Sequence, residues 1–254
     1  MKRTTQIVVP CYNEAQRLDD VALLSMVGDA EVGLVLVDDG STDATLARLE
    51  ALALRSGGKA RVLSMRSNQG KAEAVRCGLL SALENGAQRV GYFDADMSTP
   101  PEDLRHLLEA LSRPGVQFVM GARVALLGRR IERSPGRHYL GRVFATIASG
   151  ILQIPIYDSQ CGAKVMLRSR VLEDALSEPF RSRWVFDVEL IGRLLAGSAL
   201  APGLPLEAFV ELPLQRWREV EGSSLKPGAM VRVLGELAGI GLDLSRRRKN
   251  ARQD

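Results

Sequence analysis

The chain has 254 residues, 46% of them hydrophobic and 25% charged, with a net charge of +4, which is ordinary for a globular protein with a full hydrophobic core. Three cysteines without disulfide or metal-ligand spacing, and only two histidines, argue against a disulfide scaffold, zinc chemistry and a serine triad. No apolar run is long enough to cross a bilayer or to act as a signal peptide, so we expect a cytoplasmic protein with reduced thiols.

The first half of the chain predicts alternating strands and helices. Residues 32–37 are apolar without polar alternation, which is typical of a strand buried on both faces. Ser41 is a candidate cap for the helix that follows. Repeated strand–helix units predict an α/β fold with a mainly parallel, doubly wound sheet. We expect strands at 6–9, 32–37, 61–64, 89–93 and 116–120, and helices at 13–26, 42–55, 70–85 and 100–111.

The second half is less regular. It predicts an arginine-rich loop at 121–137, a helix at 137–152, a strand at 161–167, a helix at 186–196, a strand at 206–212, a loop at 216–226 and a helix at 227–244. There is no internal repeat and no low-complexity linker. We therefore expect one domain over 1–226, with halves 1–120 and 121–226, followed by an amphipathic helix and basic tail at 227–254.

Two apolar runs end abruptly in paired acidic residues, VLVDDGSTD at 35–43 and VGYFDADMS at 90–98. Close carboxylates resist joint ionisation unless a cation lies between them, and hard oxygen ligands favour Mg²⁺ or Mn²⁺. The carboxyl ends of parallel strands share one edge of a sheet, so PCYNE at 10–14 should meet both acidic motifs there. Asp94 and Asp96 lie on one side of an extended backbone and can hold a metal ion completed by water and substrate phosphates.

Other residues at this edge suit a nucleotide. Asp38 and Asp39 can accept hydrogen bonds from a ribose or a base, and Tyr12 can stack on that base. Lys71 follows Asn68-Gln69-Gly70 at the start of a predicted helix, where a glycine lets the backbone approach a ligand and the helix N-terminus favours an anion. A plain loop before a capped helix is the alternative for this last motif.

PCYNE, VDDGSTD, NQGKAEAVRCGL and FDADMS, in this order and spacing, resemble the inverting glycosyltransferases of family 2, which have the nucleotide-diphosphosugar-binding GT-A fold. The similarity continues through most of the chain, and it is greatest to the polyprenyl-phosphate sugar transferases of the dolichyl-phosphate glucosyltransferase branch. The motifs that carry this part are GAR at 121–123, DSQCGAK at 158–164, RWVFDVEL at 183–190 and EGSSLK at 221–226. The resemblance implies a nucleotide-sugar donor, expected to be UDP-glucose, a polyprenyl-phosphate acceptor, and Mg²⁺ or Mn²⁺ as cofactor.

The resemblance also assigns roles to individual residues. It implies that residues 1–120 bind the donor and residues 121–226 the acceptor. Arg123 and the loop after it should meet the acceptor phosphate, and Gln160 should contact substrate. Ser98 and Ala72 depart from the pattern, since mannosyl members often carry glutamine and NQGKG relatives carry glycine at these positions. The nucleoside should be bound by Pro10, Tyr12, Glu14, Asp38 and Asp39, and the metal and diphosphate by Asp94 and Asp96.

The expected chemistry follows from charge. The metal, Lys71 and Arg123 would stabilise the departing nucleoside diphosphate. A lipid phosphate is already an anion near neutral pH and needs no strong base, whereas a sugar hydroxyl would need a carboxylate, for which Asp187 is the candidate. Asp187 also lies in the first turn of a predicted helix, where a capping role is equally reasonable. Trp184 can stack on a sugar or fill the core.

Basic residues are concentrated at 123–142 and 246–249, which favours an anionic partner. The apolar faces predicted at 137–152 and 227–244 can lie on a bilayer, pack on the core or pair with a second copy in a homodimer. We expect a peripheral protein on the inner face of the membrane, with no nucleic-acid partner. The alternatives are a transferase with a soluble hydroxyl acceptor, a nucleotidyltransferase, for which PCYNE is the wrong loop, and a non-catalytic nucleotide-sugar sensor.

Overall fold

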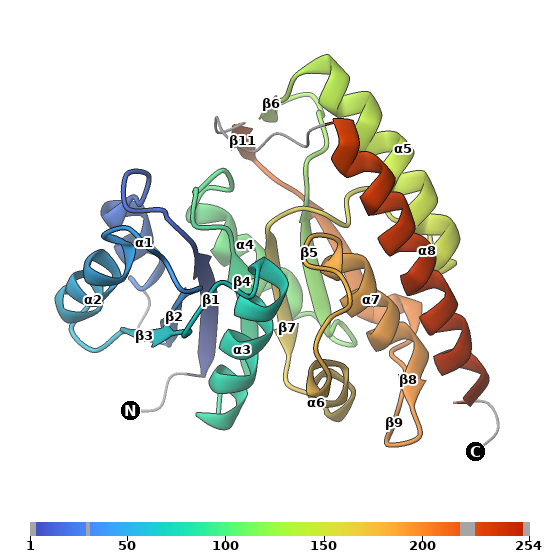
Figure 1. Ribbon diagram of the computed structural model, residues 1–254, viewed down its shortest axis with the longest axis horizontal. Coiled ribbons are helices and arrows are strands. Elements are labelled where there is room, and N and C mark those ends of the chain that lie inside the picture. Colours follow the sequence, from blue (N-terminus) through green and yellow to red (C-terminus); the bar gives the residue numbers. More distant parts are fainter. Residues whose placement is uncertain (1–3, 29–30, 219–226, 251–254) are drawn as a thin grey trace.

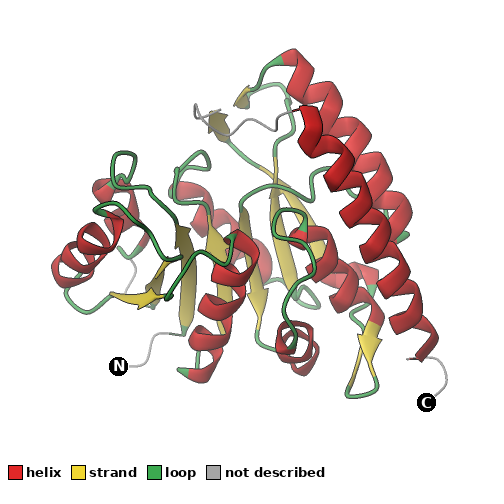
Figure 2. Ribbon diagram, viewed as in Figure 1, coloured by secondary structure: helices red, strands yellow, loops and turns green. Residues whose placement is uncertain are grey.

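A seven-stranded sheet with helices on both faces forms the centre of the molecule (Figure 1), and Figure 2 shows how strands and helices alternate around it. The computed structural model describes residues 4–28, 31–218 and 227–250. Its elements are β1 (Thr5–Cys11), α1 (Asp20–Met26), β2 (Val32–Asp38), α2 (Thr45–Arg55), β3 (Ala60–Ser64), α3 (Lys71–Glu84), β4 (Arg89–Phe93), α4 (Glu102–Leu111), β5 (Phe118–Ala122), β6 (Arg130–Glu132), α5 (Pro135–Leu152), β7 (Ala163–Leu167), α6 (Arg170–Ser177), α7 (Phe186–Ala196), β8 (Gly197–Ser198), β9 (Ala201–Pro202), a 3₁₀ turn (Leu206–Ala208), β10 (Phe209–Pro213), β11 (Arg216–Arg218) and α8 (Pro227–Asn250).

The strand order in the sheet is β10-β5-β7-β4-β1-β2-β3. Neighbouring strands are parallel except at β7, which runs antiparallel to both β4 and β5. The α/β prediction with a mainly parallel sheet is therefore confirmed. Two short pairs, β6 with β11 and β8 with β9, lie outside the main sheet.

Alternating side chains of the strands feed two hydrophobic layers, as the period of two along a strand requires. On β1, Val8 packs into the layer that includes α3, α6 and α7, whereas Ile7 and Val9 pack into the layer that includes α1, α2 and α4. Helix α8 contributes Leu237 and Ile240 to the first layer, and it lies beside α5 along its length (Figure 1). None of the described helices is both long and apolar enough to span a membrane.

The antiparallel direction of β7 decides which residues reach the functional edge. The parallel strands β1, β2, β4 and β5 end at one edge of the sheet, and β7 begins there because it runs the other way. Residues 158–162, immediately before β7, therefore join the loops that follow the parallel strands. A parallel β7 would have placed these residues at the opposite edge.

Two predicted helix starts are wrong. The helix expected at 13–26 begins only at Asp20, because the Asp19 side chain accepts a hydrogen bond from the N–H of Ala22 at 2.9 Å and caps it there. Ser41 does not cap α2, which begins at Thr45 without a side-chain cap. Its Oγ instead accepts the N–H of Asn13 at 3.0 Å, which ties the loop after β2 to the loop after β1.

The second half differs more from prediction. Helix α6 was not predicted, and the expected loops at 121–137 and 216–226 contain β6 and β11, which pair with each other. The strand expected at 161–167 begins at Ala163, the one expected at 116–120 lies at 118–122, and the one expected at 206–212 opens with a 3₁₀ turn. Helix α8 continues to Asn250, so the basic residues 246–249 are helical. The EGSSLK motif at 221–226 and residues 251–254 lie outside the described part of the chain.

Candidate active site

A cavity of about 430 Å³ opens at the carboxyl edge of the sheet. The loop after β1, the loop after β2, the segment before α3 and the segment before α7 all contribute to it. Most of the residues predicted to bind the nucleotide line this cavity together. Its lining includes Pro10, Tyr12, Glu14, Asp39, Asn68, Gly70, Lys71, Arg183 and Trp184.

Asp39 shapes the loop that begins α3. Its carboxylate accepts the backbone N–H groups of Gln69 at 2.7 Å and Gly70 at 2.8 Å, and the side-chain amide of Asn68 at 3.1 Å. Burial raises the pKa of Asp39, and the two N–H groups act against that rise. Asp38 is 2% exposed, accepts the N–H of Ser41 at 3.3 Å and does not line the cavity.

Arg183 is a cavity residue that the sequence reasoning missed. Its Nε donates to the carbonyl of Gln69 at 3.0 Å and its Nη2 to the side-chain oxygen of Asn68 at 2.9 Å. Gly70 has a φ of 95°, and a Cβ on it would lie 2.6 Å from Nε of Arg183. The loop before α3 is therefore held by two side chains: Arg183 donates hydrogen bonds to it, and Asp39 accepts hydrogen bonds from it. Its signal was the first letter of RWVFDVEL, a motif in which the sequence points to the tryptophan and the aspartate as site residues and to Glu189 as a structural partner of a nearby arginine. The last expectation is confirmed by the ion pair of Glu189 with Arg193.

Asp94 and Asp96 follow β4 and lie close to Lys71, the first residue of α3. The Nζ of Lys71 lies 2.6 Å from Oδ1 of Asp94. Burial by itself lowers the pKa of Lys71, but Asp94, Asp187 and Asp96 raise it above its usual value. The three carboxylates thus act on one ammonium group. Asp96 also accepts the N–H of Ser98 at 2.9 Å.

The start of β7 packs directly against Asp94. The N–H of Asp94 donates to the carbonyl of Gly162 at 2.9 Å. A Cβ on Gly162 would lie 2.0 Å from Oδ2 and 2.2 Å from Cγ of Asp94, far inside van der Waals contact. Glycine is therefore the residue that leaves room for this carboxylate.

The carboxylates suit a metal ion that is completed by substrate. In the described ranges, no cluster of three or more histidine, cysteine, aspartate or glutamate side chains could hold an ion alone. Asp94 and Asp96 offer two hard oxygen donor groups. Burial raises the pKa of Glu14, and the negative charge of Asp96 adds to this rise. The carboxylates of Glu14 and Asp96 are therefore close enough to repel each other. This donor set fits Mg²⁺ or Mn²⁺ whose other ligands are water and diphosphate oxygens.

A second cavity, of about 290 Å³, lies between the end of β5, the start of α5 and α8. One part of its wall is polar and basic and the other is apolar. The polar part comprises Arg123, Arg133, Arg137, Asp158, Ser159 and Gln160, and the apolar part Leu140, Phe144, Ala145, Val185, Trp217 and Val233. We refer to the two cavities as the donor cavity and the arginine cavity.

Arg123 is rigidly held in the arginine cavity. Its Nε and Nη2 donate to the two oxygens of Asp158 at 2.6 and 2.7 Å, and its backbone N–H donates to Oδ2 at 3.0 Å. Burial by itself lowers the pKa of Arg123, but Asp158 raises it, and the charge of Asp94 adds to the rise. Burial likewise opposes ionisation of Asp158, yet Arg123 holds the pKa of that carboxyl below its usual value. The guanidinium is a fixed positive charge within electrostatic reach of Asp94.

Two polar atoms in this cavity are unusual. Within the described residues, Nε2 of Gln160 and Oγ of Ser159 are buried without a hydrogen-bond partner. Buried polar atoms in folded proteins normally have a partner. Both side chains line the cavity, so they can hydrogen-bond to a molecule bound in it.

Asp187 lies in the first turn of α7, whose N-cap residue, Val185, makes no side-chain capping hydrogen bond. Its Oδ1 lies 2.7 Å from Nζ of Lys164, a fully buried lysine, and also accepts the hydroxyl of Tyr92. Lys164 donates in addition to the carbonyl of Cys161 at 2.6 Å. Asp187 is therefore the counter-ion of a buried lysine, and it also lies in the predicted first helical turn, where a negative charge is favourable.

The sequence model of Glycosyl transferase family 2 matches residues 6–174, more than half of the chain. The chain therefore belongs to glycosyltransferase family 2. A dolichyl-phosphate beta-glucosyltransferase of Drosophila melanogaster is 30% identical over 248 residues, covering 87% of this chain and 69% of that protein. A polyprenol monophosphomannose synthase of Mycolicibacterium smegmatis is 27% identical over 229 residues, covering 90% of this chain and 83% of that protein. The predicted relation to polyprenyl-phosphate sugar transferases is confirmed.

Solved structures agree with this assignment. Glucosyl-3-phosphoglycerate synthase from Mycobacterium tuberculosis, in complex with Mn²⁺, UDP-glucose and phosphoglyceric acid, matches with a TM-score of 0.66 and 25% identity, covering 94% of this chain and 80% of that one. The GT-A fold is thus confirmed. The chain is a glycosyltransferase, and the alternatives of a nucleotidyltransferase and a non-catalytic sensor are set aside.

Proposed function

We propose that this glycosyltransferase moves glucose from UDP-glucose to a polyprenyl phosphate, with inversion, at the surface of a membrane. The observation that carries the proposal is a pair of cavities, one lined by the predicted nucleotide residues, including the Lys71 that pairs with Asp94, and one lined by arginines and an apolar wall. The names of the sequence relatives support the acceptor. The UDP-glucose complex of the structural relative supports the donor.

The donor cavity offers the groups that a nucleoside diphosphate sugar requires. Tyr12 and Trp184 line it and are 44% and 63% exposed, so each can stack on a base or a sugar. Lys71 and the N-terminus of α3 place positive charge where a diphosphate would lie. The backbone of Gly70 can approach it closely.

The charges support displacement of the diphosphate. Asp94 and Asp96 would hold Mg²⁺ or Mn²⁺, which would supply Lewis-acid stabilisation of the diphosphate. Lys71 contributes a second cation beside Asp94. A phosphate acceptor brings its own anionic oxygen, so it needs no general base. This agrees with the engagement of Asp187 by Lys164 and Tyr92.

The arginine cavity fits an amphiphilic phosphate. Arg123 can present its guanidinium to phosphate oxygens while Asp158 keeps it in place. Leu140 and Phe144 of α5 line the same cavity and offer an apolar surface to a prenyl chain. A soluble sugar acceptor would have little use for this apolar wall.

A peripheral membrane location is supported by exposed apolar side chains. Leu126, Leu127, Tyr139, Leu140 and Val143 are all exposed. They belong to the loop before β6 and to the first half of α5, at the end of the molecule where β6 and the start of α5 lie together (Figure 1). Exposed apolar residues next to arginines are typical of proteins that bind the surface of an anionic bilayer. We place the protein on the cytoplasmic face.

The test is transfer of radiolabelled sugar from a panel of nucleotide sugars to a short polyprenyl phosphate, with Mn²⁺, Mg²⁺ or EDTA. We expect label in the organic phase with UDP-glucose and either ion, and none with EDTA. Asp96→Asn should abolish this transfer and leave the fold intact. Label from a different donor would correct the sugar or base, and no organic-phase label from any donor would refute the acceptor.

Gln160 gives a sharper test of the arginine cavity. Gln160→Leu should raise the acceptor KM and leave UDP affinity unchanged, because Gln160 lines this cavity and its buried Nε2 has no described protein partner. The same change should not lower the melting temperature, since it removes a buried polar group that makes no hydrogen bond in the folded chain. An unchanged acceptor KM would remove Gln160 from the acceptor site.

One observation favours a small phosphorylated acceptor as second candidate. The structural relative was solved with phosphoglyceric acid, and the polar part of the arginine cavity could receive a carboxylate and a phosphate. The same assay decides, because label would then remain in the aqueous phase with phosphoglyceric acid. Transfer to that acceptor but not to a lipid phosphate would establish the second candidate.

A further inference from the structure

Segment 178–185 connects α6 to α7 and carries two residues of the donor cavity, Arg183 and Trp184. We infer that Glu236 of α8 is a positioning residue for this cavity. It acts through Ser182, and it holds Arg183 and Trp184 where they meet the nucleotide. The inference rests on the proposed donor site and adds to it a residue from a distant helix.

Ser182 is the joint between α8 and the segment. It is 1% exposed, and its hydroxyl donates to Oε2 of Glu236. The hydroxyl oxygen of Ser182 also accepts hydrogen bonds from the backbone N–H groups of Trp184 at 3.2 Å and Val185 at 2.8 Å. A serine hydroxyl has one hydrogen and two lone pairs. Because Glu236 takes the hydrogen, the lone pairs are directed to the two N–H groups, and the turn that presents Arg183 and Trp184 is set.

This turn is hydrogen-bonded directly to the loop that precedes α3. Arg183 donates to the carbonyls of Gln69 and Asn68 and to the Asn68 side chain. The N–H of Gln69 in turn donates to Asp39. A displacement of the turn would therefore loosen both walls of the donor cavity, the one with Trp184 and the one with Asp39.

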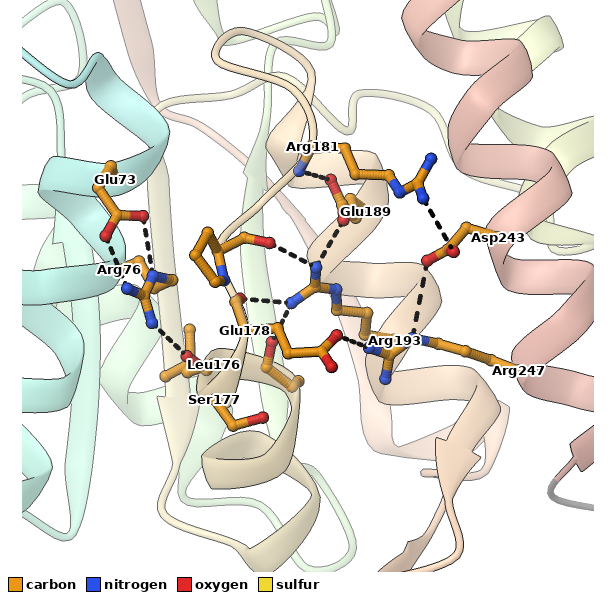
Figure 3. A network of polar contacts seen from close by, with 12 residues as sticks. Glu73, Arg76, Leu176, Ser177, Glu178, Arg181, Glu189, Arg193, Asp243 and Arg247 are labelled. Atoms are coloured by element: carbon orange, nitrogen blue, oxygen red, sulfur yellow. Dashed lines mark hydrogen bonds and ion pairs between the residues drawn. The ribbon is translucent and has the colours of Figure 1, made fainter.

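The other end of the segment is fixed independently of Glu236. The N–H of Arg181 donates to Glu189 at 2.9 Å, and Glu189 forms a buried ion pair with Arg193 at 2.7 Å (Figure 3). Arg181 also faces Asp243 of α8, but at 3.7 Å and with its side chain 58% exposed. Exposed pairs of this kind contribute little. Asp243 is therefore a matched control, an acidic residue on the same helix that faces the same segment.

The first measurement is the affinity for UDP with Mn²⁺ by titration calorimetry, beside donor and acceptor KM. Glu236→Ala should weaken UDP binding about tenfold, the equivalent of about 1.4 kcal/mol, and raise the donor KM without changing the acceptor KM. Glu236→Gln keeps an acceptor oxygen for Ser182 and should restore most of the affinity. Asp243→Ala should bind UDP as the wild-type chain does. Equal losses in Glu236→Ala and Asp243→Ala would overturn the inference, because they would indicate general loosening of α8.

The second measurement does not depend on the identity of the donor. Amide hydrogen exchange at Trp184 and Val185 should become faster in Glu236→Ala, and only slightly so in Glu236→Gln. Ser182→Ala combined with Glu236→Ala should be no worse than Ser182→Ala alone, since loss of the Ser182 hydroxyl already removes the contact that Glu236 makes. Unchanged exchange at these amides would refute the role of Glu236. If the wild-type chain failed to bind UDP, the donor assignment would be wrong and the exchange experiment would still decide.

Discussion

Replacing Gly162 by alanine should impair the proposed metal site without changing either of its proposed ligands, Asp94 and Asp96. Gly162 precedes β7 and lies against the carboxylate of Asp94. Its φ is not positive, so the backbone itself accepts an alanine. The effect of the substitution is therefore confined to the space that the new methyl group takes from Asp94.

The contact distances set the magnitude. The new Cβ would lie 2.0 Å from Oδ2 of Asp94. Ordinary non-bonded contacts need about 3.5 Å, so the carboxylate or the start of β7 must move by about 1.5 Å. The ion pair of Lys71 with Asp94 at 2.6 Å resists such a movement. A misplacement of about 1 Å in a catalytic site costs about 100-fold in rate, and overpacking costs about 1–3 kcal/mol of stability.

The assay compares kcat, Mn²⁺ dependence and UDP affinity of Gly162→Ala with those of Gly150→Ala. Gly150 lies in α5, and a Cβ there would meet no atom within 4 Å. The control should keep full activity and unfold at a slightly higher temperature, because alanine favours helix. Gly162→Ala should lose about 100-fold in kcat and require more Mn²⁺. Activity equal to that of the control would refute the reasoning that Asp94 must stay where Gly162 allows it.

Three further outcomes are expected. Glu189→Gln should lower the free energy of unfolding by about 3 kcal/mol, since it leaves the buried Arg193 without its counter-ion, and urea denaturation will measure it. Asp158→Asn should lower the free energy of unfolding by a similar amount at pH 7, but the difference from wild type should shrink below about pH 4. The pKa of Asp158 is lower in the folded than in the unfolded chain. Its ionised carboxylate therefore stabilises the fold fully above the unfolded-state pKa, and this stabilisation is lost as the pH falls through the folded-state pKa. Lys71→Met should lower kcat about 100-fold at saturating Mn²⁺, with little change in melting temperature; a loss confined to stability would contradict its assignment to the diphosphate.

Local pattern was enough to predict that most of the residues of the donor cavity lie together. Asp39 and Asp94 each follow an apolar run, and the end of a buried strand is a local property of the sequence. Parallel strands joined by helices then bring such ends to one edge, so the two motifs had to meet. Tyr12 and Glu14 were placed by the same reasoning, and Lys71 by its position after a glycine at the start of a helix. All three line the donor cavity with Asp39.

The direction in which β7 enters the sheet could not be predicted from the local sequence pattern. Nothing in the residues of β7 distinguishes a strand that enters the sheet antiparallel from one that enters it parallel, because side chains alternate in the same way in both. The direction nevertheless decides that Asp158, Gln160 and Gly162 lie beside Asp94 and Arg123. Their roles could be expected from resemblance alone until the topology was known.

The sequence by itself determined the fold class, the acidic edge and the family, because these depend on periodicity and on short motifs whose residues are neighbours along the chain. The tertiary structure alone decided the partners of buried polar groups that lie far apart along the chain. Asp187 pairs with Lys164, and Ser182 with Glu236, across separations of 23 and 54 residues. Such pairs form only after the layers have packed, when each charge that leaves water must find its counterpart among the side chains that the fold has brought within reach.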